Sequence, residues 1–523
     1  MRGVIAAGDP QTVAAGVEMF HKGGNAVDAA VAAAFAALVS EAVLVNIGGG
    51  GLAVLWDGHE GVVYDFLPTM PGRPPFPRMD FTQVWVDFGE EQQPFYIGRA
   101  SVAVPGLVAG LCALAEEWGM LPLATLLSPA IRLAREGAVL SEPLAYILRI
   151  LMPIFSYTPE MAAVFTRDGR PYGPGERLRF PELAHTLERL AQEGPALFYE
   201  GEIAQAIVAD QESHGGLITR EDLAAYRVLK HSPLHVPYRQ RSVLVPPPPS
   251  NGGALVGFSL RLLDGLPVNT WEHNGVEYIH ALATVMALTN EARSTWDRLR
   301  VQGTSGADTF LQEEHVAPYR KRLATALSSG RWPTTTTSPG SPYTTHISVA
   351  DENGLWVSLT TTAGENAGFL VGETGVSLNN MLGELDLHPQ GFHRLKPGER
   401  LSSMMTPTIV LEDGHPRVAT GSGGSSRIRS AVLQVLLNVL DYDFPVQEAV
   451  ELPRVHYEAD VLQLEGGIEP HVAQALAARG YRINRWSTRN MYFGGAHTIV
   501  RQHGRLDAAG DPRRGGATYV YVS

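Results

Sequence analysis

SPYTTHISVAD, residues 341–351, marks the place where the chain changes character. Residues 333–342 are rich in proline, threonine and serine. These residues disfavour a helix or a central strand, because proline lacks an N–H donor and the hydroxyls compete for backbone groups. Residues 346–350 and 355–362 are predicted strands. The Asp-Glu-Asn-Gly sequence at 351–354 predicts a hairpin turn between them, since Asn-Gly tolerates positive φ.

Pairing across this hairpin brings two threonines together. A turn centred near Asn353 places Thr344 opposite Thr362, because each lies nine residues from the centre. We interpret the Tyr343–Thr344 bond as a processing site whose cleavage gives Thr344 a free α-amine. With a pKa of about 7.7–8.0, such an amine can take the proton of the threonine hydroxyl and make it a nucleophile. The alternative is an ordinary exposed loop followed by a hairpin with threonine-rich edges.

The composition is that of a globular protein with large buried cores, since 45% of the 523 residues are hydrophobic and 18% are charged. A net charge of −13 without a basic cluster argues against nucleic acid or an anionic membrane as a partner. The single cysteine, Cys112, rules out internal disulfides and cysteine-based zinc sites. The 17 histidines show no ligand pattern, and no nucleotide, flavin or haem motif stands out, so we expect neither a metal nor another cofactor.

Two segments bear on localisation. Residues 1–10 contain no long apolar stretch followed by a cleavage site, so they do not resemble a signal peptide. Residues 29–45 are alanine-rich but are interrupted by Ser40 and Glu41, and they fall short of the roughly 20 residues of a spanning helix. They predict a buried helix, and we expect a cytoplasmic protein.

Helical patterns dominate the first two-thirds of the chain, and short antiparallel strands with a few helices fill the rest. Residues 57–100 are proline-rich and are predicted to be irregular. The glycine run at 48–51 precedes a strand and lacks a following Lys-Ser/Thr, so it predicts close backbone packing and not a phosphate loop. The sequence GSGGSS at 421–426 opens a helix with one apolar face.

Seven motifs in order resemble those of the γ-glutamyltranspeptidases (glutathione hydrolases), and the resemblance covers nearly the whole chain. They are Gly23 to Ala30, Gly48 to Gly51, Val104-Pro105-Gly106, Pro247 to Gly253, Thr344-Thr345-His346, Leu401 to Met404 and Gly421 to Arg427. The resemblance implies an α+β fold, the four-layer αββα sandwich of N-terminal nucleophile hydrolases. It also implies a precursor that cuts itself into residues 1–343 and 344–523, a large and a small subunit that remain one intertwined domain.

The resemblance assigns roles to individual residues. Thr344 matches the nucleophile, and Thr362 matches a second threonine that hydrogen-bonds to it. The backbone N–H groups of Gly424 and Ser425 match the oxyanion hole, where the family has a glycine pair. Ser402 and Ser403 match a serine pair that binds the substrate α-carboxylate. Without the resemblance, these two serines would be interpreted as a strand-edge pair that makes local backbone bonds.

Other substrate-binding positions depart from the family pattern. Glu365 and Asn366 are the nearest candidates for the asparagine that binds the substrate α-amine. Methionine replaces a glutamine at 381, and Glu384 stands in for an aspartate. Arg73 and Arg78 straddle the place of the carboxylate-binding arginine, and we favour Arg78. The loop between 384 and 401 is short and has no tyrosine, so no lid is expected and the site is open to bulkier donors and to water.

Three functions are therefore compared. The first is a γ-glutamyl hydrolase or transferase acting on small glutathione-like donors, with water or an amino acid or dipeptide as acceptor and hydrolysis favoured. The second is a related amidohydrolase for another acyl group, such as a glutaryl-cephalosporin acylase or an oxamate amidohydrolase. The third is an unprocessed, inactive relative with a binding or structural role.

Overall fold

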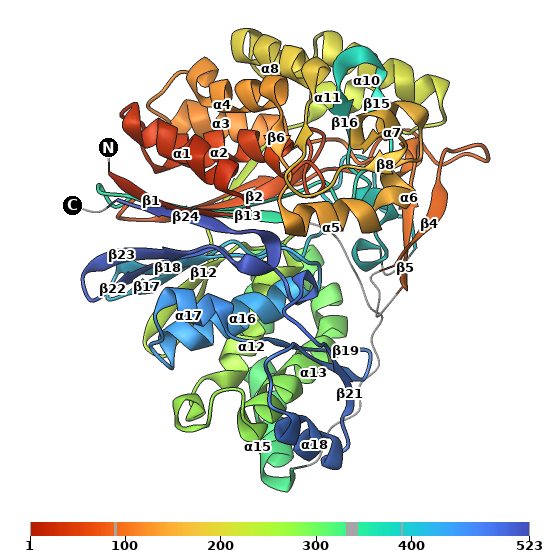
Figure 1. Ribbon diagram of the computed structural model, residues 1–523. Helices are drawn as coiled ribbons and strands as arrows, with labels where there is room; N and C mark the ends of the chain where they lie inside the picture. The colour runs from red at the N-terminus through yellow and green to blue at the C-terminus, as the bar shows by residue number, and fades with distance from the viewer. Residues whose placement is uncertain (1, 88–91, 331–343, 389–390, 522–523) are drawn as a thin grey trace.

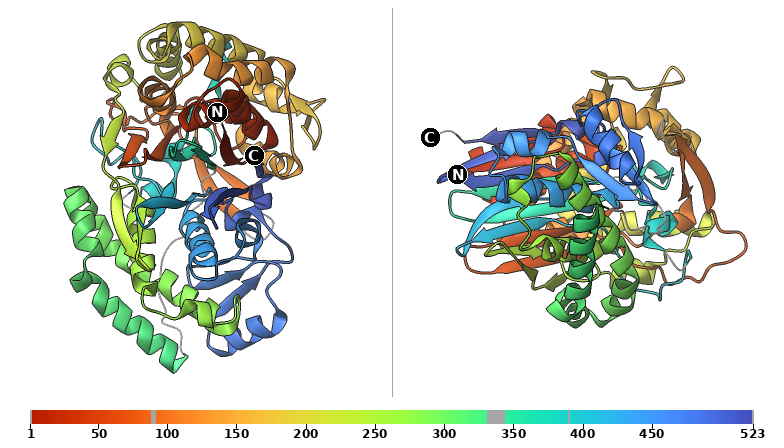
Figure 2. Two further views of the ribbon diagram at one scale, coloured as in Figure 1. Left: turned by 90° about the vertical axis from the view of Figure 1, so that its left-hand side faces the viewer. Right: turned by 90° about the horizontal axis from the view of Figure 1, so that it is seen from below.

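Two β-sheets lie face to face in the middle of the molecule, and helices cover the outer face of each (Figure 1). In the left view of Figure 2, the red-to-yellow helices lie on one side of the sheets and the green and blue helices on the other. The computed structural model describes residues 2–87, 92–330, 344–388 and 391–521. The layers follow the order helix, sheet, sheet, helix, which confirms the predicted αββα sandwich.

The first sheet mixes strands from both sides of residues 331–343. Both strands of the predicted hairpin, β13 (Thr345–Asp351) and β14 (Trp356–Thr362), lie inside it. There β13 pairs with β1 (Gly3–Ala7) and β14 pairs with β2 (Gly50–Trp56), each antiparallel. The spatial order of the sheet is β10 (Leu229–His231), β3 (Gly61–Phe66), β2 (Gly50–Trp56), β14 (Trp356–Thr362), β13 (Thr345–Asp351), β1 (Gly3–Ala7) and β24 (Ala517–Val520).

Side chains of the first sheet alternate between two cores, as the two-residue period of a strand requires. On β1, Ile5 and Ala7 pack with the helices on the outer face, which include α1 (Pro10–His21), α2 (Ala26–Ser40), α3 (Leu107–Trp118), α4 (Leu123–Glu136) and α8 (Pro181–Glu193). Val4 and Ala6 point the other way and pack in the core that holds the second sheet.

The second sheet also combines early and late strands. Its order is β11 (Leu234–Tyr238), β12 (Arg241–Val245), β17 (Thr408–Glu412), β18 (His415–Thr420), β22 (Thr498–Gln502) and β23 (Arg505–Ala509). The helices on its outer side include α12 (Asn251–Leu263), α13 (Val276–Leu299), α16 (Arg427–Leu440) and α17 (Val446–Glu451). Every residue of α16 is buried, so this helix is part of the core as well as its cover.

Side-chain caps begin the first two helices. The Asp9 carboxylate accepts from the Gln11 N–H at 2.8 Å, and Pro10 occupies the first turn of α1. Asn25 and Asp28 form a reciprocal capping box at the start of α2. All of α2 is buried, as predicted for this alanine-rich segment. In the part of the chain that the structure describes, no helix is long and apolar enough to cross a membrane.

The prediction that residues 57–100 are irregular is wrong. They contain β3, which joins the first sheet, and the separate hairpin of β4 (Thr82–Asp87) and β5 (Gln92–Ile97). The prolines that suggested a loop lie mostly between these strands, and Pro94 lies within β5 of a two-stranded sheet, where a missing N–H costs least. The single cysteine, Cys112, is buried in α3.

Candidate active site

The hairpin of β13 and β14 places the two threonines as predicted. Thr345 pairs with Thr361 and His346 pairs with Thr360, so the register extends to Thr344 opposite Thr362. The Thr344 hydroxyl donates to the Thr362 Oγ1 at 3.3 Å, and the Gly364 N–H donates to the same oxygen at 3.1 Å. Tyr343, the other residue of the expected cleavage site, lies outside the described residues. The hydroxyl pair is buried, at 1% and 4% exposure, so its geometry is set by the sheet and not by solvent.

The glycine run at 48–51 packs its backbone against this pair, which confirms the interpretation of close packing. Gly50 pairs with Thr362 across the sheet. A Cβ on Gly49 would lie 2.2 Å from the Thr362 carbonyl oxygen, so no larger residue fits there. The run therefore fixes the strand that carries the second threonine.

The segment 421–426 crosses directly over Thr344. A Cβ on Gly423 would lie 2.1 Å from the Thr344 carbonyl oxygen. Gly424 and Ser425 have φ of 118° and 53°, and α16 begins two residues later at Arg427. Positive φ is uncommon for a serine, so the turn at Ser425 is held by its surroundings. The N-terminal end of a fully buried helix is thereby placed beside the candidate nucleophile.

His346 lies two residues from Thr344 but is engaged elsewhere. One of its ring nitrogens bonds the Thr360 hydroxyl at 2.8 Å, and the other bonds the Ser348 hydroxyl at 2.9 Å. Burial lowers its pKa well below the usual value, so the ring is neutral. These contacts give His346 a structural role in the sheet.

Two charged residues that the sequence did not indicate approach the same dipeptide. Arg514 donates from Nη1 to the Thr344 carbonyl oxygen at 3.0 Å. Glu41 accepts from the Thr345 hydroxyl at 2.5 Å and from the Thr12 hydroxyl at 2.7 Å. The pKa of Glu41 is raised to about 7, mainly by burial and also by the nearby charge of Asp9, while the two hydroxyl donors and Arg514 lower it. The contacts join residues about 170 and 300 positions apart, so no local sequence pattern predicts them.

Ser402 and Ser403 are buried, at 5% and 4% exposure. The Ser403 Oγ accepts from the Met405 N–H at 3.1 Å, and its carbonyl accepts from the Asn251 N–H at 2.8 Å. For Ser403, these contacts are the local backbone bonds of the alternative interpretation. They tie the serine pair to the turn before α12.

Carboxylates gather at the loop that follows Thr362. The Asn380 side chain accepts from the Glu365 N–H at 2.7 Å and donates to the Glu365 carboxylate at 3.0 Å. The Glu384 carboxylate reaches the same loop, since a Cβ on Gly364 would lie 2.7 Å from its Oε1. Asn366 has a φ of 100° and accepts from the Gly368 N–H at 2.9 Å. Two buried acidic side chains, those of Glu365 and Glu384, therefore lie at the loop that directly follows Thr362.

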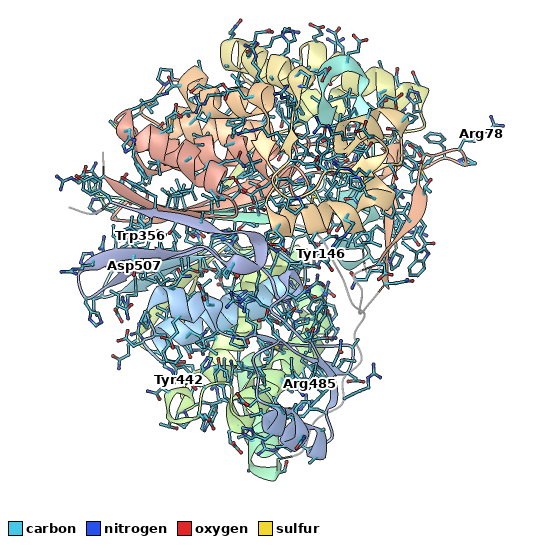
Figure 3. All side chains as sticks on the ribbon, viewed as in Figure 1. Arg78, Tyr146, Trp356, Tyr442, Arg485 and Asp507 are labelled. Atoms are coloured by element: carbon cyan, nitrogen blue, oxygen red, sulfur yellow. The ribbon has the colours of Figure 1, made fainter. Side chains whose placement is uncertain are left out.

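The structure does not bring the two candidate arginines to this loop. Arg73 donates to the Gly216 carbonyl at 3.2 Å and to the Glu212 carboxylate at 3.3 Å. Arg78 is exposed, and Figure 3 shows it at the outer edge of the molecule with its side chain pointing outward. A carboxylate clamp made by either residue is not formed in this arrangement.

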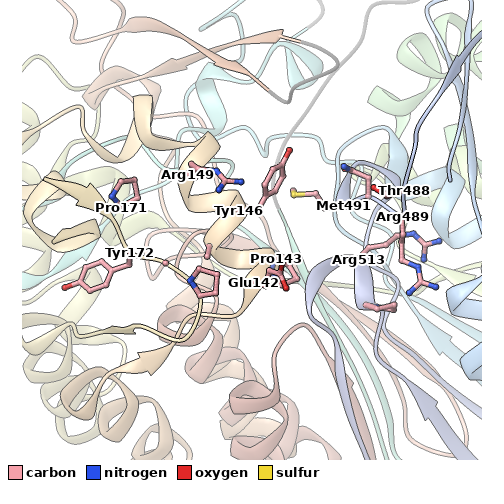
Figure 4. A pocket seen from close by; sticks show the side chains of 15 residues that line it. Glu142, Pro143, Tyr146, Arg149, Pro171, Tyr172, Thr488, Arg489, Met491 and Arg513 are labelled. Atoms are coloured by element: carbon pink, nitrogen blue, oxygen red, sulfur yellow. The ribbon is translucent and has the colours of Figure 1, made fainter. Parts of the chain in front are cut away.

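A cavity of about 610 Å³ lies between α5 (Glu142–Ile150) and the segments around 488–491 and 512–513. In Figure 4, Tyr146 and Arg149 of α5 face Met491 and Arg489 across it. Among the described residues that line it, none is a candidate catalytic residue. The described part of the chain also holds no group of three His, Cys, Asp or Glu residues that could bind a metal.

A buried Thr–Thr pair inside an αββα sandwich, with Thr344 just before β13 and Thr362 at the end of β14, is typical of the N-terminal nucleophile hydrolases. The chain belongs to the γ-glutamyltranspeptidase family, whose model, described as "Gamma-glutamyltranspeptidase", matches residues 12–521. It is accordingly an enzyme of the γ-glutamyltranspeptidase-like type.

Three similar proteins illustrate the range of the family. "Acylase ACY 1 proenzyme" of Pseudomonas sp. (strain SE83) is 34% identical over 496 residues, which are 92% of this chain and 88% of that protein. "Glutathione hydrolase proenzyme" of Escherichia coli (strain K12) is 30% identical over 551 residues, covering 98% and 90%. The crystal structure of cephalosporin acylase from Bacillus halodurans superimposes with a TM-score of 0.84 at 26% identity, covering 100% of this chain and 96% of that one.

Proposed function

We propose that the protein is a self-processing amidohydrolase in which Thr344 is the nucleophile. The observation that carries this proposal is the buried hydroxyl pair of Thr344 and Thr362, 3.3 Å apart, beneath the segment 421–426. In the precursor, the Thr344 hydroxyl attacks the carbonyl carbon of Tyr343. The Tyr343–Thr344 C–N bond then breaks, which leaves an ester on Oγ1 and a free α-amine on Thr344 that takes up the hydroxyl proton. Water hydrolyses this ester to the Tyr343 carboxylate and the Thr344 hydroxyl. The products are the large subunit, 1–343, and the small subunit, 344–523.

Turnover uses the same hydroxyl. The freed α-amine of Thr344 takes the hydroxyl proton, and Oγ1 attacks the amide carbonyl of the donor. The N–H groups of Gly424 and Ser425, beside the N-terminal end of α16, are the proposed donors to the oxyanion. The tetrahedral intermediate expels the amine, which takes the proton from the Thr344 ammonium. Water then releases the acyl group from Thr344, and an amino acid or dipeptide amine would give transfer instead.

We propose a γ-glutamyl compound as donor. The carboxylates of Glu365 and Glu384 beside the Thr362 loop are complementary to the α-ammonium group of a γ-glutamyl donor. This group is absent from a glutaryl donor of the same length. The proposed role of Ser402 and Ser403 is to hold the α-carboxylate.

A second candidate, an acylase for a dicarboxylic acyl group without an α-amine, is favoured by a different observation. Met381 stands where the resemblance implies a glutamine that helps to bind the α-amine, and it is buried in an apolar cluster, so it offers no polar group to that amine. The similarity to two acylases supports the same candidate.

Initial rates on γ-glutamyl-p-nitroanilide and glutaryl-p-nitroanilide separate the two candidates, because the substrates differ only at the α-carbon. A higher kcat/KM on the γ-glutamyl anilide supports the first, and a higher kcat/KM on the glutaryl anilide supports the second. A denaturing gel tests processing itself, since a cut chain gives two bands. Adding a dipeptide acceptor tests for transfer, and we expect little gain in rate.

A further inference from the structure

Two buried side chains of opposite charge form hydrogen bonds with the dipeptide Thr344–Thr345. Arg514 comes from the short helix η8 (Pro512–Arg514) near the C-terminus, and Glu41 follows the last residue of α2. Both are buried, at 2% and 0% exposure. Neither has a role in the chemistry proposed above, and each bonds one residue of the dipeptide.

Arg514 joins the nucleophile to the oxyanion segment. Its Nη1 bonds the Thr344 carbonyl at 3.0 Å, and Cβ atoms built on Gly423 and Gly424 would lie 2.9 Å from Nη1 and 3.2 Å from Nη2. The guanidinium therefore lies close to both Thr344 and the backbone that is to bind the oxyanion. A lysine could keep the charge there but could not span both sides, because an ammonium is a compact point charge.

A second ionic network fixes the helix that carries Arg514. Asp511, one residue before η8, pairs with Arg454 at 2.6 Å and with Arg513 at 3.2 Å. Arg513 in turn pairs with Glu465 at 2.5 Å. All four side chains are almost completely buried, so they give η8 little freedom to move.

Glu41 holds the next residue and faces a small set of polar groups. The Thr345 and Thr12 hydroxyls each bond one oxygen of its carboxylate, and Ser40 bonds Thr12 at 2.8 Å. The charged groups that act on it are Asp9, at the start of α1, and Arg514. Glu41 is therefore the counter-charge of Arg514.

We propose that Arg514 and Glu41 are positioning residues for Thr344. Arg514 fixes the nucleophile against the oxyanion segment, and Glu41 fixes Thr345 and balances the charge of Arg514. This inference rests on the proposed role of Thr344. The freed α-amine belongs to the residue whose carbonyl Arg514 binds, so the positive charge disfavours protonation of the amine and the Glu41 carboxylate opposes that effect.

The Glu41 carboxyl titrates in nearly the same pH range as the freed α-amine of Thr344. The pKa of Glu41 is raised to about 7 by burial, close to the pKa of about 7.7–8.0 of a free α-amine. His497 also faces Arg514, but burial lowers its pKa to about 4, so it stays neutral at assay pH. The acid limb of the pH–rate profile should therefore respond to Glu41.

The test measures kcat and KM between pH 5 and 9, on whichever of the two anilides the wild-type enzyme hydrolyses. Glu41→Gln should move the acid limb of kcat/KM to lower pH by about half to one pH unit, because the charge of Arg514 is then unopposed. Arg514→Gln should move it to higher pH and lower kcat by about ten- to a hundredfold with KM nearly unchanged. Arg514→Lys should lower kcat but leave the limb near its wild-type position.

Glu18→Gln and Arg239→Gln make the same chemical changes far from the dipeptide and serve as controls. If a variant at position 514 remains a single chain, it has no free α-amine at Thr344 to titrate, and the test then rests on Glu41→Gln, whose acid limb should still move to lower pH. Profiles within 0.2 pH units and twofold of wild type for all three variants would overturn the inference. So would a uniform loss of activity that follows lowered thermal stability without any movement of the limb. Failure of the underlying proposal is recognised separately, by an uncut wild-type chain or by an active Thr344→Ala variant.

Discussion

Replacing Glu41 by glutamine should make the folded chain increasingly more stable than its parent as the pH rises. The folded-state pKa of Glu41 is about 7, and its ordinary value is 4.5. A group whose pKa is raised by folding stabilises the fold below its unfolded pKa, and this stability is lost as the pH rises through the folded pKa. Glutamine can bond the same hydroxyls but does not titrate, so the variant does not lose this stability as the pH rises.

The size of the effect follows from the two pKa values. Their difference, from 4.5 to about 7, corresponds to about 3 kcal/mol at 1.36 kcal/mol per pKa unit. Glu41 is fully buried, so solvent does not screen this contribution. We therefore expect the free energy of unfolding of Glu41→Gln, relative to its parent, to rise by about 3 kcal/mol between pH 4.5 and pH 8.

Urea unfolding followed by tryptophan fluorescence measures this difference. The Thr344→Ala background keeps the protein as one chain, so that unfolding stays unimolecular in parent and variant. Glu18→Gln is the control, because the pKa of Glu18 is lowered by Lys22 and Arg132 despite some burial, and its replacement should act in the opposite direction. A difference between Glu41→Gln and its parent that stays constant with pH would refute the reasoning.

Four further variants test the site. Thr344→Ala should remain a single chain of 56.5 kDa on a denaturing gel and hydrolyse neither anilide; two bands would place the cut elsewhere. Thr362→Ala should be processed but lower kcat by about tenfold or less, the worth of one hydrogen bond; unchanged kinetics would argue against the pair. Glu384→Gln should raise KM for the γ-glutamyl anilide and leave KM for the glutaryl anilide unchanged, whereas equal effects on both would contradict an amine-binding role. Gly423→Ala should block self-cleavage, because its Cβ would lie 2.1 Å from the Thr344 carbonyl oxygen. Normal processing in pulse-labelled cells would show that residues 421–426 can move to accommodate the Cβ.

How much the sequence predicts depends on how local each contact is. The pairing of Thr344 with Thr362 was predictable because a hairpin turn fixes the register of the strands on either side of it. The caps at Asp9 and Asn25 were predictable for the same reason, since each bonds a residue two or three positions away.

The rest of the site depends on contacts that cross the chain. Glu41 looked like an interruption in an alanine-rich helix, and its partner Thr345 lies about 300 residues later. Arg514 lies in a Gly/Arg-rich stretch near the C-terminus, with nothing local to link it to Thr344. Strand β3 was missed because the prolines around it outweighed its short run of β-branched residues.

The mixed order of the strands has a consequence for the lifetime of the mature enzyme. In the first sheet, β14 and β13 from after the proposed cut lie between β2 and β1 from before it, and β1 lies between β13 and β24, so strands of the two subunits are interleaved. Neither subunit can leave without breaking both sheets. The precursor refolds as one molecule, but two separated subunits must first find each other, so recovery from denaturation should depend on protein concentration only after the cut. Self-cleavage would then replace a chain that refolds reversibly with an enzyme whose lifetime depends on its rate of unfolding.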